Sequence, residues 1–141
     1  MWGPLLWKTI HSFGRVLKEV KDGALRETLT RETSNLCDLL IRSIPCPSCK
    51  NHAVQYKMSH RIANANTKSD SFEEWVYIFH NEVNRRIQKI MIGREQANKL
   101  YITTDPIKTL DEYLRSINSK TRHGVNDTNI RERANMIMSR I

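Results

Sequence analysis

The chain has 141 residues, of which 39% are hydrophobic, 27% are charged and only five are glycine. This suits one globular domain with a modest core and excludes collagen-like repeats and low-complexity disorder. The net charge of +8 allows a nucleic acid, an anionic cofactor or an acidic protein as partner, but a solvated basic surface explains it equally well. No apolar run approaches the roughly 20 residues of a membrane span, and no signal peptide is visible, so we expect a cytoplasmic protein with no membrane span.

Apolar side chains recur at helical spacing through most of the chain, and polar clusters, proline and glycine interrupt the pattern. Asp22-Gly23 breaks the first helical stretch, Pro45 ends the second, and the polar residues 60–70 form a loop. We therefore predict an all-α fold, a small helical bundle with a helical C-terminal extension and no strand. The expected helices cover residues 2–20, 24–43, 47–58, 71–91, 95–101, 107–117 and 129–140.

Cys46 and Cys49 form a CxxC motif at the expected start of the third helix, with Pro47 in its first turn. This spacing suits either a dithiol–disulfide couple or half of a metal site, and a helix N-terminus stabilises a thiolate. With three cysteines, at least one lacks a partner within a monomer, which argues against a disulfide-stapled secreted domain.

A zinc site is one interpretation of this motif. Its ligands would be Cys46, Cys49 and His52, with Cys37, His60 or His80 as the fourth. A second ligand pair at short spacing is missing, and the cysteine of the second helix suits a small buried residue better than a ligand. On this interpretation the chain is a zinc-stabilised helical binding module whose basic charge suits nucleic acid.

A redox pair is the other interpretation, and it needs an electron acceptor. In thioredoxin-like proteins CxxC follows a strand, whereas helices flank this motif on both sides, so a flavin is the obvious acceptor. Trp7 and His11 are four residues apart and share a helix face, where an indole and an imidazole could hold a heteroaromatic ring. A core tryptophan beside a satisfied histidine explains this pair more simply.

A second polar cluster lies on the fourth expected helix. His80, Asn81 and Asn84 share one side of a helix that otherwise carries apolar residues, and asparagine is a mediocre helix former. Arg86 and Lys89 continue that side and would suit a pyrophosphate. The alternative is a solvated polar stripe.

Taken together, these segments resemble the Erv/ALR family of FAD-dependent sulfhydryl oxidases. The residues that carry the resemblance are Trp2-Gly3 with Trp7 and His11, Cys46-Pro47-Ser48-Cys49, and His80-Asn81-Glu82-Val83-Asn84 with Ile87 and Lys89. They occur in the family's order and at similar spacing over residues 2 to about 101. We therefore predict an oxidase domain at 1–101 and a helical extension of unknown role at 102–141.

The resemblance implies a four-helix bundle with a short fifth helix, enclosing FAD. It implies that Cys46 is the outer, substrate-facing sulfur and Cys49 the flavin-proximal one. A substrate thiolate would attack Cys46, Cys49 would pass the electrons to the flavin, and oxygen would take them up to give hydrogen peroxide. The residues expected to contact FAD are Gly3, Trp7, His11, His80, Asn81, Val83, Asn84, Arg86 and Lys89; no metal is expected.

Two family features are missing here, a shuttle cysteine pair and a disulfide on the fifth helix. The substrate is then expected to be a protein dithiol or a small thioredoxin-like shuttle protein, and residues 93–101 must be ordered by packing. This minimal form looks most like the oxidases of large cytoplasmic DNA viruses, which implies host cytoplasm or the virion. The resemblance also implies a homodimer through the first helices, and makes nucleic acid an unlikely partner.

Overall fold

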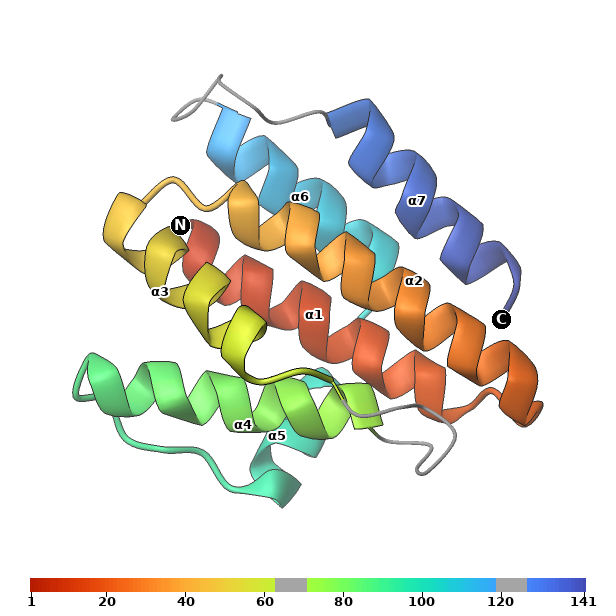
Figure 1. The fold of residues 1–141 in the computed structure, drawn as a ribbon, viewed down its shortest axis with the longest axis horizontal. Helices are drawn as coiled ribbons and strands as arrows, with labels where there is room; N and C mark the ends of the chain where they lie inside the picture. Colours follow the sequence, from red (N-terminus) through yellow and green to blue (C-terminus); the bar gives the residue numbers. More distant parts are fainter. Residues whose placement is uncertain (63–70, 119–126) are drawn as a thin grey trace.

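The computed structural model describes residues 1–62, 71–118 and 127–141 (Figure 1). Within these ranges the regular elements are all helices, which confirms the predicted all-α fold. They are α1 (Trp2–Lys18), α2 (Gly23–Arg42), α3 (Pro47–Ser59), α4 (Ser71–Arg86), α5 (Arg94–Tyr101), α6 (Pro106–Asn118) and α7 (Asp127–Ser139). No helix in the described part of the chain is long and apolar enough to cross a membrane.

Local signals set the starts of α2 and α3. Asp22 is the N-cap of α2, and its carboxylate accepts hydrogen bonds from the backbone N–H groups of Ala24 and Leu25. Cys46 is the N-cap of α3, and Pro47 follows at the first helical position, where its missing N–H costs nothing. These signals explain why the predicted starts of α2 and α3 are close to the observed ones.

The predicted end of α4 at Met91 is wrong, because the helix ends at Arg86. Gln88 has a φ of 59°, and the N–H of Lys89 donates to the carbonyl of Asn84 at 2.8 Å. The N–H of Gln88 donates to the carbonyl of Arg85, which completes a Schellman cap without the usual glycine. Ile87 and Ile90 continue the apolar spacing in sequence, but both are exposed beyond the helix.

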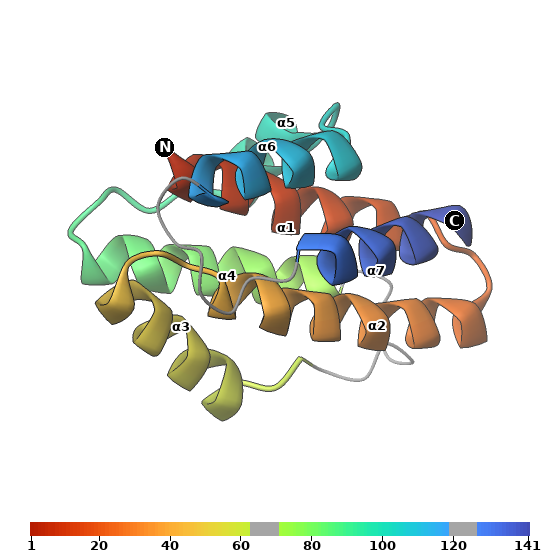
Figure 2. The same ribbon diagram turned by 90° about the horizontal axis from the view of Figure 1, so that it is seen from above.

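Helix α1 lies at the centre of the molecule. It packs against α2, α4, α5 and α6, and its most extensive contacts are with α6 (Figures 1 and 2). Gly14 allows the close approach of α4, since a Cβ atom there would lie 2.9 Å from the Cα of Glu73. The first turns of α1 keep Pro4 and Lys8 exposed, so the dimer through the first helices that the family resemblance implies stays a prediction.

The C-terminal extension belongs to the same core as the rest of the chain. Helix α6 covers α1, and α7 packs on α2 and α6 (Figure 2). The extension buries the side chains of Leu110, Tyr113, Leu114, Ile117, Ile130, Ala134 and Ile137. Its two helices thus form an additional layer on the bundle, on the far side of α1 and α2 from α4.

Candidate active site

The CxxC pair lies at the N-terminus of α3. Cys46 and Cys49 form a disulfide, with their Cα atoms 5.2 Å apart. The backbone N–H of Cys49 also donates to the Sγ of Cys46 at 3.3 Å. A helix N-terminus that donates to sulfur favours the thiolate of a reduced pair, which is the reactive form in disulfide exchange. Cys46 is half-buried and Cys49 is exposed in the chain alone.

One face of α3 connects the disulfide to a cluster of aromatic rings. Cys49, Ala53 and Tyr56 follow one another at helical spacing, so they share this face. The ring of Tyr56 stacks on Phe79 of α4 with centroids 4.7 Å apart, and Phe79 meets Trp7 of α1 edge-on at 5.3 Å. The helix face that carries Cys49 therefore leads, two turns further along α3, to aromatic rings of α4 and α1.

The aromatic cluster continues through two histidines. It comprises Tyr56, Phe79, Trp7, His80, His11 and Tyr101, drawn from α1, α3, α4 and α5. Trp7 stacks on His80 with centroids 3.9 Å apart, and Tyr101 stacks on His11 at 4.3 Å. The structure thus brings together three of the predicted residues, because His80 contacts Trp7 and His11, which lie more than 60 positions before it in the chain.

His11 and His80 share a buried hydrogen bond, with 2.9 Å between Nε2 of His11 and Nδ1 of His80. Burial, with a smaller contribution from the neighbouring His80, lowers the pKa of His11 to about 3. Burial lowers the pKa of His80 to about 4, with a further contribution from Lys89. Both imidazoles are therefore neutral at physiological pH, and one ring donates its proton to the other.

The two asparagines of α4 have local partners. The side chain of Asn81 donates to the carbonyl of Ile92 and accepts from its N–H, each at 2.9 Å. Tyr77 Oη also donates to the Ile92 carbonyl, at 3.0 Å. Asn84 is buried and donates to Oδ1 of Asn81 at 3.5 Å. Asn81 therefore fixes the segment between α4 and α5 in the chain alone.

The remaining residues that were predicted to contact FAD lie outside the aromatic cluster. Val83 is half-buried against the core, while Arg86 and Lys89 are exposed at the end of α4, where the Schellman cap fixes the backbone of Lys89. Gly3 is half-buried, and a Cβ atom there would meet nothing within 4 Å. The structure therefore gives no packing reason for a glycine at this position.

Sequence reasoning missed two groups that shape this site. Tyr56 and Tyr101 extend the aromatic cluster, and the signal for Tyr56 was its position seven residues after Cys49 on one helix. Arg15 holds α5 in place, because its guanidinium donates to the carbonyls of Tyr101 at 3.1 Å and Thr104 at 2.9 Å. These bonds satisfy backbone carbonyls at the C-terminal end of α5 and tie it to α1.

The described residues contain no cluster of three or more histidines, cysteines or acidic residues that could hold a metal ion. Cys37, a candidate fourth ligand for zinc, is 1% exposed within the core, and burial raises the pKa of its thiol to about 12. A neutral thiol at that depth is a packing residue, as the sequence suggested. The zinc interpretation therefore has no geometric support in the described residues.

Two hollows of the described structure lie outside the redox pair. One, of about 130 Å³, adjoins His11 between α1, α4 and α5. It is smaller than the roughly 300–1,000 Å³ of typical ligand pockets. The other, of about 340 Å³, lies between α2 and α7 and includes none of the predicted site residues. Neither hollow is a ready-made flavin cavity.

The side chains around the aromatic cluster nevertheless fit a flavin dinucleotide in their chemistry. Stacked rings of Trp7 and His80 suit a planar heteroaromatic group, and Arg86 with Lys89 suits a pyrophosphate. The redox disulfide shares a helix face with Tyr56 of the same cluster. Aromatic, amide and cationic side chains thus lie along α1 and α4, and α3, which contacts this cluster through Tyr56, carries a cysteine pair that can donate two electrons when it is reduced.

Comparison with known proteins agrees with this arrangement. A profile of the Erv1 / Alr family matches residues 4–102. The chain is 28% identical over 100 residues to a protein named FAD-linked sulfhydryl oxidase from African swine fever virus, a Tick/Malawi isolate, covering 71% of this chain and 79% of that protein. The same-named protein of a Pig/Kenya isolate is 27% identical over the same shares. No solved structure matches the chain. Because the profile covers well over half of the chain, the protein belongs to the Erv1 / Alr family.

Proposed function

We propose that this protein is an FAD-linked sulfhydryl oxidase that forms disulfide bonds in protein thiols. The observation that carries the proposal is the Cys46–Cys49 disulfide at the start of α3, on a helix face that leads to the aromatic cluster. Its family and its similarity to viral proteins named FAD-linked sulfhydryl oxidase support the same activity.

The chemistry begins with thiol–disulfide exchange at the redox pair. A substrate thiolate attacks Sγ of Cys46, a new S–S bond forms, and the Cys46–Cys49 bond breaks with Cys49 leaving as a thiolate. The second substrate thiolate then attacks the substrate sulfur that is bound to Cys46, and Cys46 leaves as a thiolate. This step releases the oxidised substrate and leaves Cys46 and Cys49 reduced. Bound FAD supplies the two-electron chemistry that returns this pair to the disulfide and, we propose, delivers the electrons to oxygen as hydrogen peroxide.

The chain's own residues have defined tasks in this scheme. The N-terminal N–H groups of α3 stabilise the cysteine thiolates. Trp7, His11 and His80 enclose the ring system, and the neutral His11–His80 pair holds a proton that can be shared between Nε2 and Nδ1. We assign the adenine and ribose side to Asn81, Val83 and Asn84. Lys89 and Arg86 are assigned to the phosphates, and Gly3 is assigned to the edge of the cofactor site.

Three further properties belong to this proposal. We propose that the protein acts in the cytoplasm, that its substrate is a protein dithiol or a small thioredoxin-like shuttle, and that it forms a homodimer. Light scattering at micromolar concentration measures the oligomeric state, and a monomeric mass contradicts the dimer.

The first test is the visible absorption spectrum of the purified protein, before and after dithiothreitol is added. Flavin bands, bleaching by dithiothreitol, oxygen uptake and peroxide production are the expected result. Cys46→Ser should abolish turnover and keep FAD bound, whereas Cys37→Ala, a matched change at a cysteine outside the pair, should retain turnover. A colourless protein even after incubation with FAD, or one that unfolds in the Cys46→Ser variant and releases zinc, would contradict the proposal.

A further inference from the structure

The charges around the redox disulfide are almost all positive. The sequence contains no acidic residue between Asp38 and Asp70, a stretch that includes the CxxC motif and the whole of α3. Arg42 ends α2 four residues before Cys46, and Lys50 follows Cys49 directly in the first turn of α3. Arg42 is exposed and Lys50 half-exposed, and within the described residues neither forms an ion pair.

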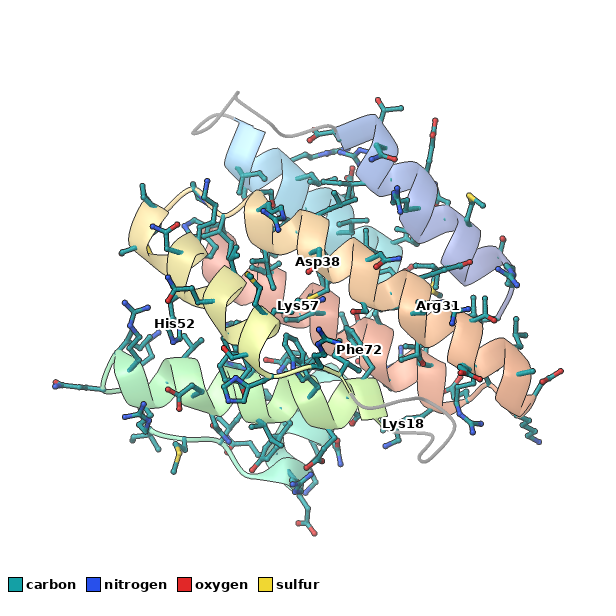
Figure 3. The ribbon with its side chains drawn as sticks, in the orientation of Figure 1. Lys18, Arg31, Asp38, His52, Lys57 and Phe72 are labelled. Atoms are coloured by element: carbon teal, nitrogen blue, oxygen red, sulfur yellow. A yellow bond between two sulfur atoms is a disulfide. The ribbon has the colours of Figure 1, made fainter. Side chains whose placement is uncertain are left out.

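The neighbouring helix end adds to this positive field. The C-terminus of α4 lies at the same end of the bundle as the start of α3 (Figure 1), and it carries Arg85, Arg86 and Lys89. Glu82 is the one acidic residue of its last turns, and Arg85 neutralises it in a salt bridge at 2.6 Å. His52 lies between the two helices (Figure 3), where burial lowers its pKa and Arg86 lowers it further.

The acidic side chains of the bundle lie elsewhere. Helix α1 contains none, and the acidic residues of α4's first turn, Glu73 and Glu74, are at the opposite end of that helix from the disulfide. Asp38, the nearest acidic residue in sequence, is held by Lys57 at 2.8 Å (Figure 3). Acidic side chains are therefore scarce at the end of the bundle that carries the redox pair.

We propose that this end of the molecule is a docking surface for an acidic protein segment that carries the substrate thiols, with Arg42 and Lys50 as its main contacts. This inference rests on the proposed oxidase function and specifies its substrate class. Arg86 and Lys89 are assigned to the cofactor phosphates, so the cations left for a substrate are those beside the CxxC motif. A nucleic acid would be attracted by the same charge, but it has no thiol to exchange with Cys46.

The positive field also matches the chemistry of the exchange step. Carboxylates near a substrate cysteine raise the pKa of its thiol and reduce the reactive thiolate fraction. Docking against Arg42 and Lys50 offsets this effect at the moment when the thiolate attacks Sγ of Cys46. Steering by a field of this kind raises association rates by about 10- to 1,000-fold at low salt, and the effect falls within a screening length of about 10 Å at 0.1 M.

The test compares two dithiol peptides of equal length and cysteine spacing, one flanked by Glu and Asp and the other by Lys and Arg. For the FAD-loaded full-length protein, kcat/KM for each peptide is divided by that for dithiothreitol. We expect the acidic peptide to be favoured by about 10-fold or more at low salt, with the preference lost as salt rises. The Arg42→Glu/Lys50→Glu variant should remove or invert this preference.

The matched control is Lys21→Glu/Arg31→Glu, which makes the same change of charge at two exposed residues away from the disulfide (Figure 3 labels Arg31). It should keep the wild-type preference. Equal rates for both peptides in the wild type, with dithiothreitol still oxidised, would overturn the docking inference alone. Failure to oxidise dithiothreitol at all would instead overturn the proposed function.

A binding measurement separates the acidic protein segment from nucleic acid. Fluorescence anisotropy with serine versions of both peptides should give tighter binding of the acidic one, weakened in the Arg42→Glu/Lys50→Glu variant. A single-stranded DNA oligonucleotide is the competitor. If it displaces the acidic peptide and binds more tightly than the peptide does, the positive surface is a nucleic-acid site and the inference is wrong.

Discussion

At the scale of single residues, Gly14 shows how the backbone of one helix limits the side chains of another. A Cβ atom at this position would lie 2.9 Å from Cα of Glu73, a backbone atom that cannot move aside as a flexible side chain would. Alanine is a better helix former by about 1 kcal/mol, but overpacking in a core costs about 1–3 kcal/mol. We expect Gly14→Ala to lower the free energy of unfolding by up to about 2 kcal/mol in urea titrations.

Gly3 provides the control for that substitution. It lies in the same helix, but a Cβ atom there meets nothing within 4 Å. In the protein without cofactor, Gly3→Ala should leave the free energy of unfolding unchanged or raise it by up to about 1 kcal/mol. If both variants shift stability equally, then close contact with α4 is not what selects glycine at position 14.

The His11–His80 pair predicts a dependence of stability on pH. In the folded chain burial lowers the pKa values of these histidines to about 3 and about 4, whereas an unfolded histidine has a pKa near 6.5. Between about pH 6.5 and 4 the unfolded state therefore binds protons that the folded state excludes. The free energy of unfolding of the protein without cofactor should fall as pH drops through this window.

The slope measures how many protons are involved. Each proton that the folded state fully excludes adds about 1.4 kcal/mol per pH unit to the slope of the free energy of unfolding against pH. His80→Asn removes one such group, so this slope should become shallower by close to that amount. Urea titrations at several pH values between 7 and 4 measure this. An unchanged slope in the variant would show that the acid sensitivity comes from other groups.

The site could be predicted from sequence only in part, for reasons visible in particular residues. Helical spacing placed Trp7 and His11 on one face, and the family resemblance assigned both residues and His80 to FAD, but the direct contact of the three rings was not predicted. The contact of Tyr101 with His11 depends on where α5 packs, and spacing within one helix says nothing of that. Asn81 was expected to face a cofactor, yet its amide holds Ile92 across a loop whose course the sequence does not determine.

At the scale of elements, Tyr113 links the C-terminal extension to the approach to the redox motif. Its hydroxyl is buried and lies 2.8 Å from Oγ of Ser43, the C-cap of α2 and the third residue before Cys46. Ser43 also donates to the carbonyl of Leu40 at 2.6 Å, so it keeps one partner when the tyrosine hydroxyl is removed. We expect Tyr113→Phe to lower the free energy of unfolding by about 1 kcal/mol.

A double-mutant cycle tests whether this hydrogen bond is the cause. Tyr113→Phe and Ser43→Ala should each cost about 1 kcal/mol, and the double variant should cost clearly less than their sum, because both remove the same contact. If the double variant loses as much free energy of unfolding as the two single variants together, the two hydroxyl groups do not stabilise one another.

The helices themselves were predicted more accurately than their ends and partners. Apolar periodicity located each described helix, because it reports which face is buried. It misplaced the end of α4, because Ile87 and Ile90 keep the helical spacing while the backbone turns at Gln88. A Schellman cap with a glycine would have been recognisable in the sequence; with glutamine at the left-handed position it was not.

At the scale of the whole molecule, the sequence indicated that residues 107–117 form a helix but not what this helix covers. The structure packs α6 on the central helix α1, so the extension contributes to the core of the bundle. An amphipathic pattern specifies an apolar face and leaves its partner open, which explains why the role of the extension could not be predicted. Our proposed oxidase unit at 1–101 therefore depends on residues outside it for the burial of α1.

Removal of the extension tests this dependence. Four large side chains of α6 are almost fully buried, namely Leu110, Tyr113, Leu114 and Ile117. Burial of such side chains stabilises by about 1.5–3 kcal/mol each, so their sum is comparable to the roughly 5–15 kcal/mol that stabilises a typical domain. We expect a chain that ends at Thr104 to lack a cooperative unfolding transition, whereas the full chain should unfold in one step by circular dichroism. If the shortened chain unfolds cooperatively at a similar urea concentration, α6 and α7 are an appendage on an independently stable domain, and the shared core contributes little.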